Sequence, residues 1–262
     1  MIRRLCAVSI ALLAGCTSGP PIDTSYTARG QDSRAQFLII HYTAGGFAGS
    51  LKWLTEGPVS SHYLVNDNPP TIYGLVDDAR RAYHAGASSW KGNTQLNASS
   101  IGIEIVNPGS AETANGTTWF DYPKQQIDAV VALVKKIVRE HNIKPERILA
   151  HSDIAPQRKT DPGPRFPWKR LADEGLVRWP DATAVAQRRI SFEAQLPDVE
   201  WFQRSLARHG FELAVNGELD KETQNVIKAF QMKYRPANFD GVPDAETAAL
   251  LDVLNSPDGN TK

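Results

Sequence analysis

The stretch ILAHSDIAPQRKTDPGPRFPW, residues 148–168, restricts the fold and the chemistry of this chain more than any other. Its first three residues are apolar and predict a short buried strand that delivers His151 at its end. A proline-rich loop follows and carries Lys159 and Asp161. Because Zn²⁺ accepts both imidazole nitrogen and carboxylate oxygen, His151 and Asp161 are candidate zinc ligands. Two protein ligands do not complete a zinc site, so a third is expected elsewhere.

The third candidate ligand stands at the end of another predicted strand. Residues 36–43 (QFLIIHYT) are rich in β-branched and aromatic residues, which favours a strand, and His41 lies where this strand ends. A lone histidine at a strand end is more often structural. If the two strands lie side by side, however, His41, His151 and Asp161 converge and leave a fourth position open, which is the pattern of a catalytic zinc site.

The candidate group for proton transfer is a carboxylate within a third predicted strand. Residues 101–106 (IGIEIV) alternate, so the three isoleucines face one way and Glu104 faces the other. A carboxylate in so apolar a strand is costly unless it is paired or faces a cleft. Glu104 could therefore serve as a general acid and base, and a salt bridge at the sheet rim is the alternative. Lys159 could stabilise an oxyanion, although a plain surface lysine would look the same.

A long helix is predicted over residues 123–141, where apolar residues recur at helical spacing after Pro123. This helix is expected to cover the isoleucine face of strand 101–106 and to leave the Glu104 face free for the site. Residues 108–122 are predicted to form a polar loop that borders a cleft. A metal that acidifies bound water, together with Glu104 and Lys159, suits the hydrolysis of an amide.

Further contacts to a substrate are expected from the tripeptide HAG at residues 84–86. The small residue and the glycine permit a close approach of the backbone to a ligand. The candidate substrate-binding residues are His84, Ala85, Gly86 and Asn107.

Six segments of the chain, in this order, resemble the type 2 N-acetylmuramoyl-L-alanine amidases. They are IIHYTA (39–44), SSHYLV (60–65), HAG (84–86), IGIEIVN (101–107), AHSDIAPQRKTDPG (150–163) and FPW (166–168). The fifth segment is specific and the others support it. The resemblance implies an α/β catalytic domain over residues 35–180, with a mixed central sheet flanked by helices.

The resemblance also implies a mechanism. Zn²⁺ would be held by His41, His151 and Asp161, with Glu104 as general acid and base and Lys159 stabilising the tetrahedral intermediate. Zinc-bound water would attack the amide that joins N-acetylmuramic acid to L-alanine of the peptidoglycan stem peptide. The expected partners are therefore peptidoglycan or muropeptides.

The start of the chain has the features of a secretory signal peptide over residues 1–15, with two arginines before an apolar run too short to span a bilayer. Residues 13–16 (LAGC) resemble a bacterial lipobox, which predicts lipidation at Cys16; an ordinary cleavage site is the alternative. Because Thr17 rather than Asp follows, the resemblance implies an anchor on the periplasmic side of the outer membrane. Residues 16–34 are rich in Ser, Thr, Gly and Pro and predict a flexible tether.

The end of the chain predicts a polar linker over residues 181–195 and a small three-helix domain over 196–256. Two amphipathic segments, 199–209 and 225–234, each contain Phe-Gln, and each is followed by a glycine turn and an Asp that could cap the next helix. This weak repeat resembles the type 1 peptidoglycan-binding domain, which implies that it holds the enzyme on its polymer. A helical appendage that only packs on the catalytic domain is the alternative.

Composition narrows the class of protein. The 29 basic and 29 acidic residues balance, which argues against nucleic acid as a partner. The two cysteines, Cys6 and Cys16, lie near the N-terminus and leave no internal disulfide in a processed chain. Two other functions stay open: a non-catalytic peptidoglycan-binding protein, and a zinc peptidase that cuts within the stem peptide.

Overall fold

The computed structural model describes residues 19–114 and 116–256. The described residues divide into two compact units, with the boundary between residues 32 and 33. The described part of the first unit, residues 19–32, is exposed and contains neither helix nor strand. The predicted signal peptide and Cys16 lie outside the described residues. Within the described part of the chain, no helix combines the length and the apolar character needed to cross a bilayer.

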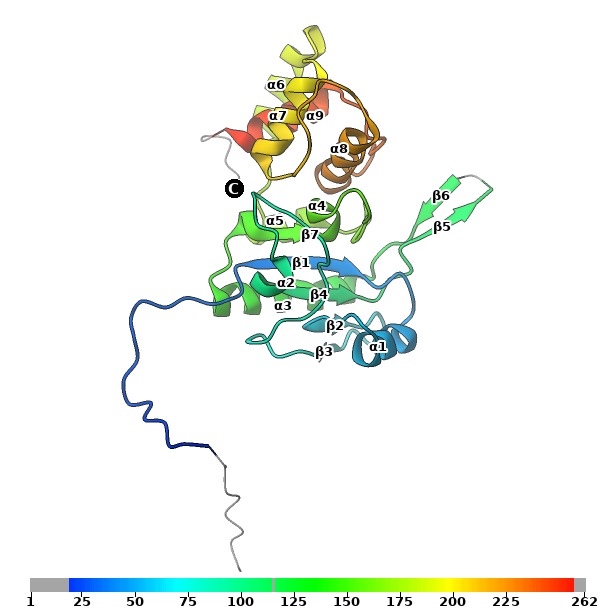
Figure 1. Ribbon diagram of the computed structural model, residues 1–262. Coiled ribbons are helices and arrows are strands. Elements are labelled where there is room, and N and C mark those ends of the chain that lie inside the picture. The colour runs from blue at the N-terminus through cyan, green and yellow to red at the C-terminus, as the bar shows by residue number, and fades with distance from the viewer. Residues whose placement is uncertain (1–18, 115, 257–262) are drawn as a thin grey trace, which may run out of the picture. The chain divides into compact units, whose positions relative to one another are not determined.

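A five-stranded mixed sheet organises the second unit (Figure 1), as the sequence predicts. Its strands, in the order β3-β2-β4-β1-β7, are Ile72–Gly74, Tyr63–Val65, Ser100–Ile105, Phe37–Tyr42 and Ile148–Ala150. β1 runs parallel to β4 and to β7, and β2 runs parallel to β4, whereas β3 pairs antiparallel with β2 at the edge. The carboxyl ends of β1, β4 and β7 therefore lie at one edge of the sheet.

The two faces of the sheet pack against different partners. The face that carries Ile101, Ile103 and Ile105 packs against α3 (Lys124–His141) and α5 (Trp168–Asp173) in one buried cluster. This confirms the predicted placement of the long helix. The opposite face carries Phe37, Ile39 and Leu149, which lie in a second buried cluster.

Short elements at the ends of the strands build the surroundings of the site. α1 (Phe47–Glu56) follows β1, α2 (Leu96–Ser99) precedes β4, and α4 (His151–Ile154) follows β7 directly. A single 3₁₀ turn, Pro145–Arg147, leads from α3 into β7.

The segment predicted as a polar loop, residues 108–122, contains a β-hairpin. β5 (Ser110–Thr113) pairs antiparallel with β6 (Gly116–Trp119), and the hairpin projects from the sheet in Figure 1. The prediction recognised its polarity but not its strands, because both strands are almost fully exposed and show no apolar alternation.

Four helices form the C-terminal region: α6 (Ala182–Ala194), α7 (Val199–His209), α8 (Lys221–Tyr234) and α9 (Ala245–Asn255). The last three are the predicted helices. The segment predicted as a linker is mostly α6, which begins after the capping residue Asp181 and packs against α9. No residue of α6 is fully buried, so its sequence carries too weak an apolar stripe to predict a helix.

The internal repeat of this region is a pair of equivalent hydrogen-bond networks. Gln203 accepts from the backbone N–H of Asn216 and Gly217 and donates to Thr223 Oγ1, at 3.0, 2.8 and 2.9 Å. In the second copy, Gln231 accepts from Gly241 N at 2.9 Å and donates to Thr247 Oγ1 at 3.1 Å. The glutamine of each Phe-Gln pair thus holds the glycine turn that follows its helix.

The capping prediction is also confirmed. Asp220 accepts from Thr223 N at 2.8 Å at the start of α8, and Asp244 accepts from Thr247 N at 2.7 Å at the start of α9. Each cap satisfies one of the backbone N–H groups that a helix start leaves unpaired.

The C-terminal helices share a core with the sheet. Phe202, Leu206 and Phe230 lie in the same buried cluster as Phe37 and Ile39 of β1. A buried ion pair joins the two regions, because Lys233 of α8 donates to Asp153 of α4 at 2.7 Å. The helices therefore pack on the sheet face that carries Phe37, Ile39 and Leu149.

Candidate zinc and catalytic site

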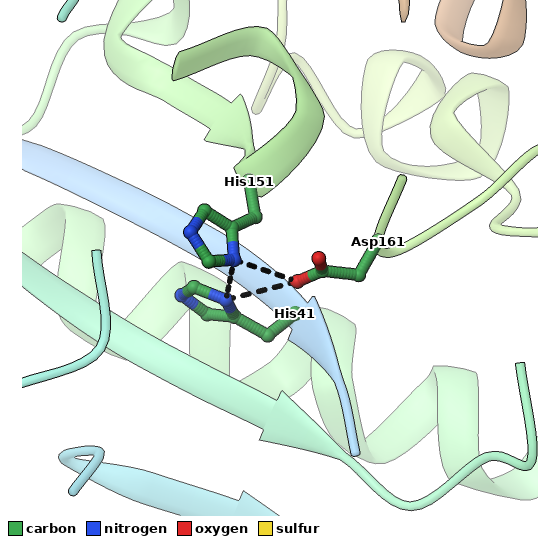
Figure 2. A group of neighbouring side chains, drawn as sticks. All are labelled: His41, His151 and Asp161. Atoms are coloured by element: carbon green, nitrogen blue, oxygen red, sulfur yellow. Dashed lines mark hydrogen bonds and ion pairs between the residues drawn. The ribbon is translucent and has the colours of Figure 1, made fainter. Parts of the chain in front are cut away.

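Three side chains from separate segments converge at the carboxyl edge of the sheet (Figure 2). His41 Nδ1 lies 2.9 Å from His151 Nδ1, and each of these nitrogens lies 3.0 Å from Asp161 Oδ2. All three residues are buried. The three ligand atoms thus form a nearly equilateral triangle.

Local sequence explains this convergence. His41 is the fifth residue of β1, and His151 begins α4 immediately after β7, which is the parallel neighbour of β1. The loop after α4 returns to the site, and Ser152 N donates to the carbonyl of Asp161 at 2.9 Å. The ends of β1 and β7 therefore lie side by side, as the predicted zinc site requires.

The triangle fits a zinc ion. Two imidazole nitrogens and one carboxylate oxygen are an established donor set, and tetrahedral bonds of about 2.0–2.1 Å place ligand atoms roughly 3.3 Å apart. The observed separations are within a few tenths of an ångström of that value. Three protein ligands leave one position for water or substrate, as in catalytic rather than structural zinc sites.

The electrostatics keep His41 and Asp161 in the forms that bind metal. Burial, and then the neighbouring His151, lower the pKa of His41 to about 4, so its imidazole is neutral at pH 7. Burial alone would raise the pKa of Asp161, but the two histidines hold it well below its ordinary value and keep the carboxylate ionised. Neutral imidazoles and an ionised carboxylate are the states that coordinate zinc.

Glu104 and Lys159 line the same cleft as the triad, which has a volume of about 430 Å³. In the sheet register, Glu104 lies directly opposite His41. Burial, and then the charge of Asp161, raise the pKa of Glu104 well above its ordinary value, while Lys159 opposes this rise. Glu104 Oε2 is inaccessible to solvent and has no hydrogen-bond partner among the described residues. A carboxyl with one buried, unpartnered oxygen in a cleft has the properties of a group that exchanges protons with a substrate.

A second group of possible ligands is less suited to a metal. Asp78, Glu140 and His141 lie close together, but both ring nitrogens of His141 already have partners, Ser33 Oγ at 2.7 Å and Asp78 Oδ2 at 3.0 Å. Glu140 is paired with Lys136 at 2.6 Å. A larger cleft of about 710 Å³, lined by Trp90, Arg178 and other residues, contains none of the triad.

Residues 31–164 match the protein family described as N-acetylmuramoyl-L-alanine amidase, and this match includes every member of the triad as well as Glu104 and Lys159.

The chain belongs to the N-acetylmuramoyl-L-alanine amidase family.

The similarity to a known amidase covers almost the whole chain. The chain is 42% identical over 258 residues to N-acetylmuramoyl-L-alanine amidase AmiD of Escherichia coli, covering 93% of each chain. Residues 195–251 match the family described as a putative peptidoglycan binding domain. The enzymatic class predicted from the sequence is thereby confirmed.

Two solved structures share the fold of the amidase. One is the complex of E. coli AmiD with anhydro-N-acetylmuramic acid-L-Ala-D-gamma-Glu-L-Lys, at 40% identity and a TM-score of 0.81, covering 91% of this chain and 96% of the other. The other is AmpDh3 of Pseudomonas aeruginosa in complex with anhydromuramic pentapeptide, at 38% identity and a TM-score of 0.82, covering 90% and 97%. The predicted mixed sheet and helical C-terminal region are common to these structures.

The four predicted substrate contacts of the amidase occupy different places. His84 lines the cleft, but its Nδ1 lies 3.0 Å from His41 Nε2 and its Nε2 lies 3.2 Å from Ser100 Oγ. Ala85 is buried and offers its carbonyl to His151 Nε2 at 3.1 Å. Gly86 has a φ of +60°, and a Cβ there would lie 2.9 Å from the Arg158 guanidinium.

Asn107 of the amidase is buried and does not line the catalytic cleft. Its side-chain oxygen accepts from Gly109 N at 2.7 Å, and its amide nitrogen donates to the carbonyl of Asp121 at 3.1 Å. These bonds join the two ends of the segment that carries the hairpin.

Several residues around the site of the amidase were not predicted from its sequence. Asn97 of α2 accepts from the backbone N–H of both His84 and Ala85, at 3.0 and 2.8 Å. Trp53 and Tyr83 line the cleft with 59% and 50% of their surfaces exposed. An exposed aromatic residue is ordinarily an isolated surface residue, so nothing in the sequence indicated that Trp53 and Tyr83 lie beside the triad.

Proposed function

We propose that this protein is a zinc-dependent amidase that hydrolyses the bond between N-acetylmuramic acid and L-alanine in peptidoglycan. The observation that carries the mechanism is the triangle of His41, His151 and Asp161 beside the unpartnered carboxyl of Glu104. A zinc ion held there would supply a Lewis acid for the scissile carbonyl and would acidify a water molecule.

Glu104 moves the proton. Its raised pKa brings it closer to neutrality, where a carboxyl can both accept and return a proton. It accepts the proton of the attacking water and then passes it to the amide nitrogen, which leaves as the amino group of L-alanine. Lys159 lines the same cleft, and its ammonium stabilises the negative oxygen of the tetrahedral intermediate.

The cleft itself suits a glycopeptide. Trp53 and Tyr83 present exposed rings at its rim, and aromatic faces pack well against the apolar faces of sugar rings. The amide linked to the sugar must reach the polar floor formed by the triad and Glu104. The substrates named in the AmiD and AmpDh3 structures, which carry a muramic acid and a peptide, have the parts that such a cleft would accept.

Digestion of peptidoglycan tests this proposal against a peptidase that cuts within the stem peptide. Purified protein is incubated with sacculi and, separately, with soluble muropeptides, and the products are identified by mass spectrometry. The proposal expects intact stem peptides beginning with L-alanine together with glycan that has lost its peptides. Muropeptides shortened inside the peptide would contradict it, and binding to sacculi without products would favour a non-catalytic role.

The proposed role of residues 196–256 is to hold the enzyme on peptidoglycan, supported by the match to a putative peptidoglycan binding domain. A protein in which the exposed surface of this region is made acidic should keep its rate on soluble muropeptides and lose rate on sacculi. An equal effect on both substrates would favour a purely structural role.

The proposed location is the periplasmic side of the outer membrane, with the chain anchored through lipid at Cys16. The lipobox-like residues 13–16 and the exposed segment 19–32 support this proposal. Metabolic labelling with a radioactive fatty acid should mark the wild type and leave Cys16→Ala unlabelled. Labelling of both proteins, or of neither, would contradict an anchor at this residue.

A further inference from the structure

His84 and Ala85 contact both histidines of the triad from the side that faces away from the other ligands. His41 points Nδ1 toward Asp161 and Nε2 toward His84. His151 likewise points Nδ1 toward Asp161 and Nε2 toward the carbonyl of Ala85. Two adjacent residues therefore meet the two ring nitrogens that do not face the metal position.

The direction of the hydrogen bonds can be assigned from their end point. The carbonyl of Leu96 can only accept, so its contact with Ser100 Oγ is donated by the hydroxyl. Ser100 Oγ then accepts from His84 Nε2, which carries the proton of that ring. His84 Nδ1 is consequently an acceptor, and His41 Nε2 is its donor. Each step leaves one possible direction when both rings are neutral.

The contacts of His84 favour its neutral form. His84 is 8% exposed, and its two ring nitrogens face His41 and the fully buried Ser100. A charged His84 would therefore be buried without a carboxylate partner among the described residues, which is costly. Neutral His41 with its proton on Nε2 has a free lone pair on Nδ1, the atom that faces the other ligands.

The surroundings of His84 leave it little freedom. Asn97 fixes its backbone through the two bonds described above. Across the ring lies Gly102 of β4, where a Cβ would come within 2.5 Å of His84 Cγ. The glycine of the IGIE sequence, two residues before Glu104, thus provides the space that the His84 ring occupies.

We propose that His84 is a positioning residue for the zinc ligand His41. His84 Nδ1 accepts a hydrogen bond from His41 Nε2–H, which leaves the lone pair of His41 Nδ1 facing the metal position. The chain of donors His41–His84–Ser100 ends at the Leu96 carbonyl. The Ala85 carbonyl does the same for His151 through a single bond. This inference rests on the proposed zinc site. It gives residues 84–86 (HAG) the role of orienting the two histidine ligands.

Zinc affinity measured by competition with a chelator tests the proposal. His84→Leu removes the acceptor and should weaken zinc binding roughly 10–100-fold, as expected when a partner of a ligand is lost. His84→Asn retains an acceptor close to the position of Nδ1 and should recover most of the affinity. His62→Leu is the matched control, because His62 is also a buried histidine but bonds to Gly102 N and the Arg80 carbonyl rather than to the triad. A folded His84→Leu protein with zinc affinity within twofold of the wild type would overturn the proposal.

Proton positions in the zinc-loaded wild type provide a second readout that needs no variant. Nitrogen-15 NMR of the histidine rings should place the His84 proton on Nε2 and detect scalar coupling from His41 Nε2 to His84 Nδ1 across their hydrogen bond. A His84 ring with its proton on Nδ1 would overturn the proposal, even if His84→Leu does not fold. Neither experiment uses substrate, so a zinc-loaded protein that fails to cleave peptidoglycan contradicts the proposed reaction and leaves this inference standing.

Discussion

The helical C-terminal region and the catalytic cleft both bury polar side-chain atoms. Among the described residues, these atoms have hydrogen-bond partners at Gln203 and Gln231 in the first region, whereas one lacks a partner at Glu104 in the second. Gln203 and Gln231 each satisfy both ends of their amide through the turn and helix start that follow their own helix, 10 to 20 residues further along the chain. Glu104 sits in the cleft with one oxygen buried and without a partner, and its pKa is strongly raised. Buried polar groups that are satisfied locally stabilise a fold, whereas one left unsatisfied is costly and is expected where a substrate completes the set.

The largest expected effect comes from removing the unsatisfied group. Glu104→Gln keeps the shape but cannot accept a proton, so kcat on a soluble muropeptide should fall by about 10²–10⁴-fold. Zinc content, measured by mass spectrometry, should stay at one ion per chain, and the free energy of unfolding in urea should not decrease. His151→Ala is the contrasting variant and should lose both zinc and turnover. Turnover within tenfold of the wild type in Glu104→Gln would remove Glu104 from the mechanism.

The ion pair between the two regions should give the next largest effect. Lys233→Met leaves Asp153 as a buried carboxylate without its cation, and breaking such a pair costs about 3–5 kcal/mol in unfolding free energy. Lys221→Met, at an exposed position of the same helix, is the control and should change stability little. Equal stability of the two variants in urea would mean that this pair does not join the regions.

Disrupting a satisfied network should lower stability without touching the chemistry. Gln203→Leu leaves the N–H groups of Asn216 and Gly217 without an acceptor, at a cost of roughly 2–3 kcal/mol. The rate on soluble muropeptides should be unchanged at a temperature where the variant is folded. A loss of rate under these conditions would show that the two kinds of polar cluster are coupled.

The smallest effect concerns the pH dependence of stability. Burial, and then the charge of Lys233, lower the pKa of the partly buried His209 to about 3, below the value of about 6.5 in an unfolded chain. The unfolded state therefore binds the extra proton between these values, and stability is fully present above pH 6.5 and falls as the pH decreases. Between pH 7.5 and pH 5, wild type should lose about 1–2 kcal/mol more than His209→Phe in urea unfolding. Parallel losses in both proteins would show that His209 is not held neutral.

Sequence patterns predicted those parts of the molecule that depend on short-range order. The alternation of IGIEIV placed three isoleucines against the long helix and Glu104 on the other face, as observed. The caps at Asp220 and Asp244 followed from a glycine turn and an Asp before each apolar stripe. Each of these features is set within one or two turns of chain, where propensity and periodicity act directly.

Contacts between distant segments could not be predicted in this way. The hairpin of residues 110–119 and the helix α6 have exposed sequences without clear periodicity. The hydrogen bond from Lys233 to Asp153 joins residues that lie 80 positions apart. Nothing in the sequence distinguishes either residue from an ordinary charged residue on the surface. The HAG motif drew attention to His84 but did not identify the residues that contact it, because these come from α2, β1 and β4.

The amino-acid sequence by itself determined which residues could bind metal and move protons, because imidazole, carboxylate and ammonium groups have fixed chemistry. It also indicated where the strands end, because their apolar patterns stop there. Only the tertiary structure decided the separations of about 3 Å within the triad, the isolation of Glu104 and the proton direction through His84. The physical reason is that burial and hydrogen-bond partners are contributed by segments far apart in the chain. A side chain acquires its pKa and its tautomer only when those segments pack around it.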